Sequence, residues 1–418
     1  MKYYFAGAGV ILGLAGWLSY TLLNPVPIPA EFATHSVARN PHVERFAADY
    51  QKLVQQAFEE AGVPGAAVVL VYDTSVLVLR GMGLRDAGQP DSVDVHTVFR
   101  LGSVSKGFAA VLAGTLVDKG QLDWDDKVQA YVPDFVLSSP EQARRITIKH
   151  LLSHTTGLPY HAYTNLIEHG EAIPSVAQRF IDVPLIAPEG EIYSYQNAAF
   201  GLIEEVAHTA TGKAYPALVI SQLLSPLRMD DASVTHDGIT GDPNRARPHV
   251  RTTRSWRAYP VSDKYYNAVS AGGINASVAD MAQWLQLLLG NRPDVVSAAA
   301  LDTIFTPVVA TKNKRRYFRR WPQVQEAYYG LGWRVLDCGP DTLVYHGGYV
   351  NSYRSEIAVN RRDRVAVCVL ASVPGPFTNR CIRGAFEVYQ QHADAIRWWE
   401  ETQRYPLVRR EPEGEKPV

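Results

Sequence analysis

Ser103 and Lys106 are the residues of this sequence whose types and spacing most clearly suit chemistry, in the stretch FRLGSVSKGFAAVL at residues 99–112. A serine hydroxyl is a weak nucleophile at neutral pH and needs a base within hydrogen-bond reach. Residues three apart on a helix share a face, and burial among small apolar residues keeps more of a lysine neutral and able to accept a proton. The pair therefore predicts a serine nucleophile with a lysine base. The alternative is a helix start with Ser103 as N-cap and Lys106 reaching solvent, and the tetrapeptide alone favours neither.

The other common serine-nucleophile signature, Gly-x-Ser-x-Gly, is absent. It is approached at Ser105, where Gly107 follows but Ser103 stands in place of the first glycine. An α/β-hydrolase also needs alternating strands and helices, whereas the strand patterns here cluster towards the two ends of the chain. The sequence therefore disfavours that fold.

The composition fits a large globular domain without a global preference for a charged partner. The 418 residues are 46% hydrophobic, and 41 Lys and Arg nearly balance 42 Asp and Glu. No net field therefore selects nucleic acid or another polyanion. Three cysteines, Cys338, Cys368 and Cys381, are too few for a disulfide framework, although one bridge could form. Cys368 lies in the apolar run RVAVCVLAS and is predicted to be a buried thiol.

The sequence indicates no metal site, and we expect no metal or other cofactor. His150 and His154 are four residues apart in IKHLLSHTTG, but no glutamate follows His150 as the helix of a metalloprotease requires. No other Cys/His spacing resembles a zinc site. We interpret both histidines as structural or capping residues.

The N-terminal segment predicts a membrane anchor. Tyr3 to Leu23 are 21 uncharged residues, which as a helix would span about 30 Å, the hydrocarbon core of a bilayer. The run ends at Asn24 and a proline-rich spacer rather than at a small-x-small cleavage site, which favours an uncleaved signal anchor. Lys2 favours a cytoplasmic N-terminus, so the rest of the chain would lie across the membrane, which in a bacterium is the periplasm. The alternative is a secreted periplasmic protein after signal cleavage.

The remaining pattern predicts an α/β fold of the α+β type. A helical pattern at 42–62 precedes two strands joined at Asp73-Thr74, residues 103–290 are mainly helical, and strands return at 328–372 before a helix from Phe377 to Glu400. Strands from both ends would form one antiparallel β-sheet flanked by the terminal helices, with the helical block inserted between them. The predicted organisation is an anchor and spacer at 1–30, one large domain at 31–395 and a charged tail at 396–418.

Six stretches resemble the serine β-lactamase and penicillin-binding-protein superfamily, in the branch of class C β-lactamases, D-aminopeptidases and related esterases (peptidase family S12-like). Their order and spacing over residues 45–390 match that family. The resemblance implies a β-lactamase/transpeptidase-like fold and makes residues 31–395 a serine hydrolase domain with Ser103 as nucleophile. The stretches are VFRLGSVSKGFAA, ITIKHLLSHTTGLP, PEGEIYSYQNAAFGLIEEVAHTATG, AVSAGGINASVADMAQWLQLLL, YYGLGW and LVYHGGYVNSYRSEIAV.

The second family element, Tyr-x-Asn, occurs four times, at Tyr163, Tyr195, Tyr265 and Tyr349. Of these, Tyr195 follows a Pro-x-Gly turn at 188–190 and precedes an apolar helix that ends in Thr-Gly, as in the family. By resemblance, Tyr195 shares a proton with Lys106 and passes it to the leaving group. Asn197 would hydrogen-bond Lys106 and the carbonyl side of the substrate. The alternative for Tyr195 is a half-buried loop aromatic.

The third family element is usually Lys-Thr-Gly, and here His346-Gly347-Gly348 follows the strand DTLVY instead. By resemblance, the Tyr349 amide joins the Ser103 amide as the oxyanion hole, and the two glycines let a substrate backbone approach the strand. A histidine near its usual pKa is largely neutral at pH 7 and holds a substrate carboxylate less well than lysine. The departure favours an esterase, or an amino- or D-amino-acid peptidase, over an efficient β-lactamase.

Two basic stretches have no role in this scheme. Residues 311–323, TKNKRRYFRRWPQ, contain six Lys or Arg and three aromatics, and residues 245–257, RARPHVRTTRSWR, form a second arginine-rich loop. The first is either a solvated loop or a patch that touches anionic lipid or an acidic envelope polymer. The second lies where the substrate-facing loops of the family lie. We expect no nucleic-acid partner, because no binding fold is recognisable.

The leading functional hypothesis is a membrane-anchored periplasmic serine hydrolase that acts through an acyl-enzyme. Its substrate would be a small molecule or peptide with an ester, amide or D-amino-acid peptide bond. The alternative is a slow-deacylating penicillin-binding or sensor protein on the same fold, or a weak class C-like β-lactamase. The acyl donor and the oligomeric state stay open at this point.

Overall fold

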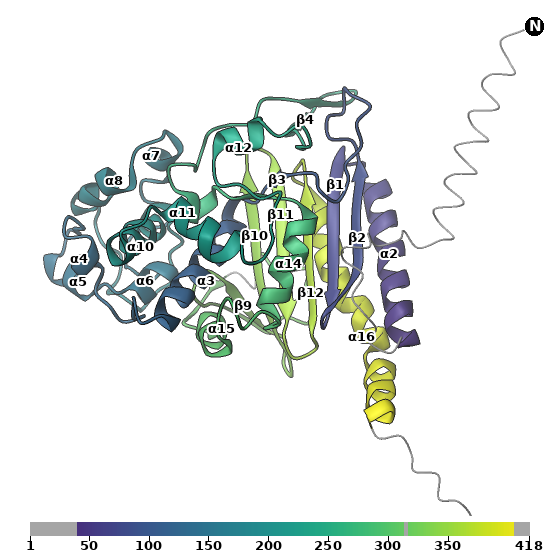
Figure 1. Cartoon of the computed structure of the whole chain (residues 1–418). Coiled ribbons are helices and arrows are strands. Elements are labelled where there is room, and N and C mark those ends of the chain that lie inside the picture. Colours follow the sequence, from purple (N-terminus) through teal and green to yellow (C-terminus); the bar gives the residue numbers. More distant parts are fainter. Residues whose placement is uncertain (1–39, 313–316, 405–418) are drawn as a thin grey trace, which may run out of the picture.

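The computed structural model describes residues 40–312 and 317–404, and its centre is an eight-stranded antiparallel sheet (Figure 1). The strand order is β2-β1-β12-β11-β10-β9-β8-β7. Because β1 pairs with β12, with Val69 opposite Cys368, segments from both ends of the chain build one sheet, as predicted. The strands are β1 (Gly65–Tyr72), β2 (Ser75–Gly83), β7 (Val309–Ala310), β8 (Glu326–Tyr329), β9 (Arg334–Asp337), β10 (Thr342–Val350), β11 (Tyr353–Asn360) and β12 (Val365–Ala371).

Local sequence explains where the first elements begin and end. Helix α2 (Pro41–Ala61) starts at Asn40, whose side chain accepts a 3.0 Å hydrogen bond from the His42 amide. It ends at Gly62, whose left-handed backbone (φ 57°) suits glycine. Asp73, also left-handed at φ 54°, lies in the turn between β1 and β2. The predicted helix and hairpin are confirmed at these positions.

The sheet is the middle of three layers. Helices α2 and α16 (Pro376–Arg404) cover one face, and the helical block covers the other (Figure 1). Along β1, Val69 and Val71 pack against the helical block, whereas Val68 and Leu70 pack against α2 and α16. A strand covered on both faces is hydrophobic at every position, which explains the uninterrupted run GAAVVLVY.

The helical block is inserted between β2 and β7, as predicted. Its central helix α3 is apolar on all sides and buried, which is typical of a core helix, and its Phe108 stacks on Trp284 of α14 with ring centroids 3.7 Å apart. The helices are α3 (Ser105–Asp118), α4 (Val128–Tyr131), α5 (Pro140–Arg145), α6 (Ile148–Leu152), α7 (Thr164–Glu168), α8 (Ile173–Arg179), α9 (Asn197–Gly201), α10 (Ile203–Thr211), α11 (Tyr215–Val219), α12 (His236–Thr240), α13 (Val269–Gly272), α14 (Val278–Leu288) and α15 (Ala298–Phe305). Two small sheets pair β3 (Phe99–Arg100) with β6 (Asn275–Ala276) and β4 (His249–Arg251) with β5 (Trp256–Ala258).

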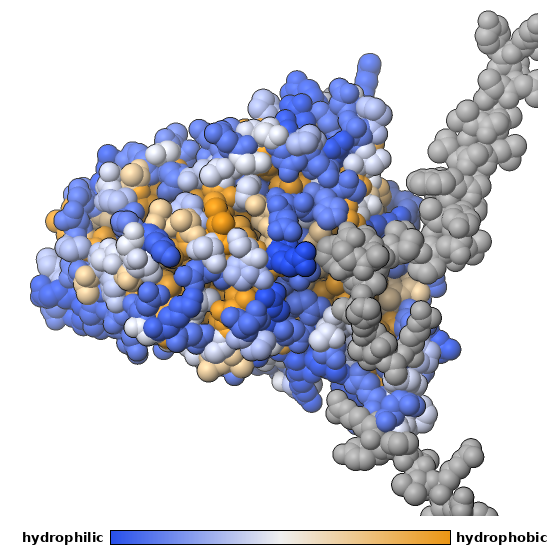
Figure 2. All heavy atoms as spheres, viewed as in Figure 1, coloured by the Kyte–Doolittle hydropathy of each residue, from blue (hydrophilic) through white to orange (hydrophobic). Residues whose placement is uncertain are grey.

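Part of the predicted organisation lies outside the described residues. The predicted anchor at Tyr3–Leu23 falls within residues 1–39, and the predicted tail overlaps residues 405–418. Helix α16 continues through residue 395 to Arg404. Within residues 40–312 and 317–404, no helix is long and apolar enough to cross a bilayer. The visible face of this part is largely hydrophilic, with hydrophobic residues gathered near the seam between the helical block and the sheet (Figure 2).

Candidate active site

Ser103 lies in a short 3-10 turn, Gly102–Val104, directly before α3. Gly102 has a left-handed backbone (φ 50°), and a Cβ there would lie 3.0 Å from the Tyr349 amide nitrogen. Glycine therefore lets this turn approach β10 closely. The half-buried Ser103 shares a hydrogen bond with the Tyr195 phenol. The predicted nucleophile is thus held between α3 and β10, in contact with the predicted proton carrier.

Lys106 is fully buried, which excludes the alternative in which it reaches solvent. Its Nζ donates hydrogen bonds to Asn197 Oδ1 at 2.8 Å and to the Ala271 carbonyl at 2.7 Å. It also lies 4.9 Å from the centre of the Tyr195 ring. Burial, together with the nearby charge of Arg334, holds the pKa of Lys106 well below its usual value. A lysine in this setting can be neutral near physiological pH and accept a proton.

Tyr195 is 7% exposed, so it is not the half-buried loop aromatic of the alternative interpretation. Burial raises the pKa of its phenol, and the hydrogen bond with Ser103 opposes part of that rise. The His154 ring lies 4.3 Å from the Tyr195 ring, centroid to centroid, and His154 Nδ1 accepts a 3.2 Å hydrogen bond from the Gln196 amide. Burial and the charge of Lys106 hold the pKa of His154 well below its usual value. His154 is therefore a neutral packing partner of Tyr195.

Asn197 connects Lys106 to a second tyrosine that the sequence analysis passed over. Asn197 Nδ2 donates to the Tyr265 hydroxyl at 3.1 Å, and that hydroxyl donates to Glu168 Oε1 at 2.9 Å. Although burial raises the pKa of Glu168, hydrogen bonds from Lys264 and Tyr265 lower it, so its carboxylate is ionised at neutral pH. Tyr265 is one of the four Tyr-x-Asn tyrosines, and it lies six residues before Ala271, whose carbonyl accepts from Lys106. That position was the signal in the sequence that could have placed Tyr265 in the site.

His346 is buried on β10 and is not a cation that faces solvent. Its Nε2 shares a 3.1 Å hydrogen bond with the Tyr329 hydroxyl, and its Nδ1 lies 3.1 Å from the Gly347 carbonyl. Burial, then the charges of Arg334 and Lys106, hold the pKa of His346 well below its usual value. The imidazole is therefore neutral throughout the physiological range, further from protonation than the sequence analysis expected.

The two glycines after His346 serve the packing of the protein itself. A Cβ on Gly348 would overlap the Leu101 carbonyl and the Ser355 hydroxyl. The Ser355 hydroxyl in turn donates a 2.5 Å hydrogen bond to Leu101 O. A Cβ on Gly347 would lie 2.7 Å from the Tyr317 hydroxyl. The absence of a side chain at these glycines therefore seats β10 against the turn that carries the nucleophile, and the approach of a substrate backbone to them stays a prediction.

The structure thus brings the sequence-predicted residues into one place. Ser103, Lys106, Tyr195 and Asn197 are joined by hydrogen bonds or direct contacts, and β10 brings the Tyr349 amide to the Gly102 turn. A sequence model of the family described as Beta-lactamase matches residues 50–390. The chain belongs to the β-lactamase family. The resemblance inferred from the motifs is confirmed.

Known proteins similar to this β-lactamase family member cover most of its length. It is 27% identical over 321 residues to the Unguisins hydrolase ungD' of Aspergillus campestris (strain IBT 28561). The aligned region covers 74% of this chain and 59% of the relative. It is 22% identical over 344 residues to Protein flp of Staphylococcus aureus (strain N315). The aligned region covers 79% of this chain and 64% of the relative. The chain therefore spans less than two thirds of the length of these relatives.

Two solved structures share the fold. The octameric penicillin-binding protein homologue from Pyrococcus abyssi aligns with a TM-score of 0.71 at 21% identity, over 82% of this chain and 77% of that one. EstCE1, a hydrolase with promiscuous acyltransferase activity, aligns with a TM-score of 0.68 at 20% identity, over 82% of this chain and 98% of that one. The predicted β-lactamase/transpeptidase-like fold is confirmed.

Arg334 is a charged residue of this site that the sequence analysis missed. It lies on β9, beside β10, opposite Tyr345. Its guanidinium donates to the Tyr193 hydroxyl at 3.1 Å, lies 6.0 Å from the Tyr195 ring centre, and has a buried Nε without a partner. No carboxylate pairs with it among the described residues. The site therefore contains a permanent positive charge that the sequence analysis did not anticipate.

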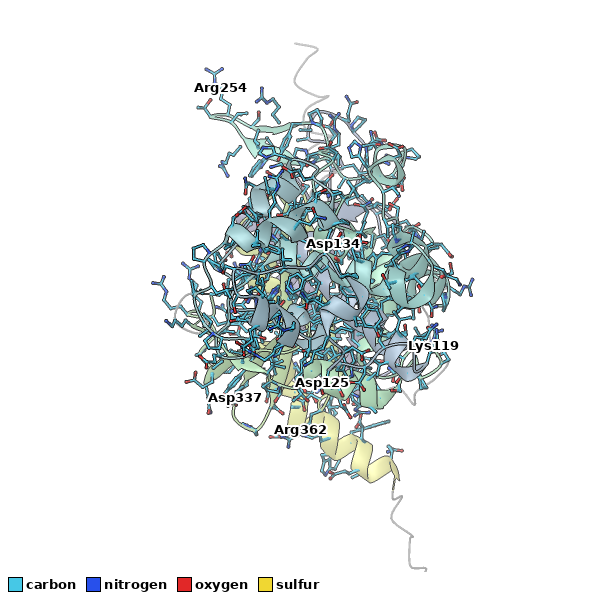
Figure 3. All side chains as sticks on the ribbon, turned by 90° about the vertical axis from the view of Figure 1, so that its left-hand side faces the viewer. Lys119, Asp125, Asp134, Arg254, Asp337 and Arg362 are labelled. Atoms are coloured by element: carbon cyan, nitrogen blue, oxygen red, sulfur yellow. The ribbon has the colours of Figure 1, made fainter. Side chains whose placement is uncertain are left out.

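Other residues singled out in the sequence lie away from this chemistry. His150 completes a capping box at the start of α6 with Thr147, which confirms its capping role. Residues 249–258 form the β4–β5 hairpin, and Arg254 projects from its tip into solvent (Figure 3). Cys338, Cys368 and Cys381 are free thiols, the last two buried. In the described part of the chain, no group of three or more His, Cys, Asp or Glu could hold a metal ion.

Proposed function

We propose that this β-lactamase family member is a serine hydrolase that cleaves an ester, amide or D-amino-acid peptide bond through an acyl-enzyme. The Ser103 hydroxyl attacks the carbonyl carbon, and its proton passes to neutral Lys106, with Tyr195 between the base and the leaving group. The amides of Ser103 and Tyr349 hold the oxyanion. Tyr195 then delivers the proton to the leaving group, and water releases the acyl group from Ser103.

The observation that carries this proposal is the burial of Lys106, with a lowered pKa, beside the ring of Tyr195, whose phenol is hydrogen-bonded to Ser103. A buried lysine that pairs with no carboxylate of the described residues is costly to a fold, so its presence calls for a reason, and base catalysis supplies one. The name of one relative, an unguisins hydrolase, supports hydrolysis as the class of reaction.

Labelling tests the proposal directly. A fluorophosphonate probe should modify Ser103 in the wild type and leave Ser103→Ala unlabelled, with the site found by mass mapping. Lys106→Ala should slow acylation by about a hundredfold or more while the protein stays folded. A label on another serine, or near-normal acylation without Lys106, would refute the mechanism. Sustained turnover of p-nitrophenyl esters supports a hydrolase, whereas one burst per enzyme supports a slow-deacylating sensor.

The cellular setting is part of the same proposal and rests on Tyr3–Leu23 alone. We propose a single-pass anchor in a bacterial inner membrane with the catalytic domain in the periplasm. Full-length protein should then pellet with membranes, resist carbonate extraction and dissolve in detergent. If the protein is instead recovered from the soluble periplasm with its N-terminus near residue 30, the segment is a cleaved signal peptide and not an anchor.

A further inference from the structure

The Ala271 carbonyl, which accepts a hydrogen bond from the proposed base Lys106, belongs to a very short helix. Helix α13 spans only Val269–Gly272, and its N-cap residue, Ala268, has no side chain that could accept from the first amides of the helix. A helix of one turn is not stable by itself, and its first amides need acceptors from elsewhere. The position of the Ala271 carbonyl therefore depends on what holds α13 from outside.

A carboxyl group from another helix supplies the missing acceptor. Glu204 of α10 accepts hydrogen bonds from the backbone amide and from the hydroxyl of Ser270, each at 2.7 Å and both through Oε1. Ser270 is fully buried and directly precedes Ala271. Glu204, 66 residues earlier in the chain, therefore takes the place of the N-cap side chain that Ala268 lacks.

The other end of α13 is tied to the helix that carries the proposed base. The Ile274 amide donates a 3.1 Å hydrogen bond to the hydroxyl of Ser105, which directly precedes Lys106 on α3. Because Glu204 holds one end of α13 and Ser105 holds the other, the Ala271 carbonyl between them has little freedom to turn. The 2.7 Å hydrogen bond from Lys106 Nζ to this carbonyl thus depends on both ties.

An acid at position 204 is costly, and the bonds from Ser270 account for it. Burial raises the pKa of Glu204 to about 7, while the bonds from Ser270 lower it. The titratable groups that act on it are Glu205 and the Tyr215 hydroxyl, neither of which is a cation, and within residues 40–312 and 317–404 no ion pair compensates Glu204. The buried residues of the same helix are apolar, namely Ile203, Val206 and Ala207.

We propose that Glu204 is a positioning residue of the active site, which holds α13 so that the Ala271 carbonyl accepts a hydrogen bond from Lys106. Glu204 acts through Ser270 and the backbone of α13, since its own hydrogen bonds go to Ser270. With α13 in place, the ammonium form of Lys106 has two acceptors, the Ala271 carbonyl and Asn197 Oδ1. The inference rests on the proposed hydrolase function, in which Lys106 is the base.

The test is the pH profile of acylation in Glu204→Met, which replaces the carboxyl with an apolar group of similar length. Loss of the acceptor releases Ser270, so the Ala271 carbonyl can turn away from Lys106. The base is then less well placed, and the rate of fluorophosphonate labelling at Ser103 should fall about tenfold or more at high pH. The ammonium form of Lys106 also loses an acceptor, which lowers its pKa, so the acid limb should move about one pH unit to lower pH.

Glu204→Gln is the conservative variant, because its amide oxygen can still accept from Ser270 although the charge is gone. Its labelling rate should stay within about twofold of the wild type, with the acid limb unmoved. Glu205→Met is the matched control, since it removes an acid from the same helix that makes no hydrogen bond to Ser270. It should also match the wild type.

Two results would overturn the positioning role. One is a slower Glu204→Met with an unmoved acid limb, which a purely structural loss would give. The other is a Glu204→Gln that behaves like Glu204→Met, which would assign the effect to charge. If Glu204→Met lowers the melting temperature, Ser270→Ala is the milder variant. It removes one of the two bonds and should move the limb in the same direction by a smaller amount.

The pKa of Lys106 separates this inference from the proposed function. It is read by NMR on protein with ¹³C-labelled lysine, the Lys106 signal being identified by its absence from Lys106→Arg. If the probe labels no serine, but Glu204→Met lowers the pKa of Lys106 and Glu204→Gln does not, the hydrolase proposal fails and the positioning role stands. If Ser103 is labelled and the pKa of Lys106 is the same in Glu204→Met and the wild type, the positioning role fails and the hydrolase stands.

Discussion

The Lys106 amine donates a 2.8 Å hydrogen bond to the Asn197 Oδ1 from a position 91 residues earlier in the chain. Because the amide oxygen faces Lys106, the amide nitrogen must face away, and there it donates to the Tyr265 hydroxyl. Tyr265 is held in turn by Glu168. The orientation of Asn197, and with it the acceptor offered to the proposed base, is therefore set by a tyrosine outside the predicted motif.

Tyr265→Phe should change the pKa of Lys106, the proposed base, and leave Ser103, the proposed nucleophile, unaltered. Loss of the hydroxyl frees the Asn197 amide to turn its nitrogen towards Lys106, which removes an acceptor from the ammonium form and lowers the pKa of Lys106. We expect kcat/KM to fall about tenfold and the acid limb of its pH profile to move to lower pH. Both are read from steady-state rates with a neutral ester.

Tyr266→Phe is the matched control, because its hydroxyl bonds Asn275 at 2.7 Å and not the Asn197 chain. Its rate and pH profile should match the wild type. Equal losses in the two variants would assign Tyr265 a purely structural role.

Arg334→Met should move the same pH profile in the opposite direction. Activity requires neutral Lys106, so kcat/KM should rise with pH through the pKa of Lys106, which lies below the usual lysine value of about 10.4. Arg334 lowers that pKa by like-charge repulsion. Its removal raises the pKa, so the acid limb should shift to higher pH.

Arg362→Met provides the control for net charge, since Arg362 is 63% exposed at a distant edge (Figure 3). Its acid limb should coincide with that of the wild type. An unmoved limb in Arg334→Met would mean that Arg334 does not act on the base.

Local sequence predicted the residues of the site that belong to short motifs. Ser103 and Lys106 share one turn, and Tyr195 was separated from three other Tyr-x-Asn tyrosines by its flanking turn and helix. The sheet and the helices that cover it were predicted from runs of hydrophobic residues and from hydrophobic residues repeated at strand or helix spacing.

The residues that were missed depend on contacts that no local pattern encodes. Arg334 reaches the site because β9 pairs with β10 and sets it opposite Tyr345. Tyr265 reaches it through Asn197, 68 residues earlier. Gly348 was predicted as a residue that leaves room for substrate, and its close approach to Leu101 in the nucleophile turn is a contact that sequence alone does not show.

His346→Lys should destabilise the protein more than it changes selectivity. The new ammonium would be buried beside the charge of Arg334, and burial followed by that charge already lowers the pKa of His346. An unpaired buried charge costs about 2 kcal/mol or more, so denaturant unfolding should show a loss of at least that size. His346→Gln keeps a neutral polar group and should lose less.

The same burial makes a pH prediction for the wild type. Since His346 stays neutral and Arg334 stays charged, the ratio of kcat/KM for a carboxylate half-ester to that for its carboxamide should be flat from pH 6 to 8. A ratio that rises towards pH 6 would show that His346 titrates in contact with substrate.

Gly107→Ala should destabilise α3 at the residue after Lys106. A Cβ on Gly107 would overlap the Trp333 ring, which is buried and packs on Phe305 and His346, with centroids 5.8 and 6.4 Å away, so it has no free space into which to move. Overpacking of this kind costs about 1–3 kcal/mol, measured as the free energy of unfolding in urea.

Gly114→Ala in the same helix is the matched comparison and should have the opposite sign. A Cβ there would lie 3.1 Å from Ile304 Cδ1, the flexible end of a side chain that can shift by a few tenths of an ångström. Alanine is favoured over glycine inside a helix by about 1 kcal/mol, so this variant should be neutral or more stable. Because both substitutions carry the same helix-propensity gain, the difference between them isolates the contact with Trp333. If Gly107→Ala is as stable as Gly114→Ala, then Trp333 has room to move, and the tight packing of α3 against the residue that precedes β9 would be disproved.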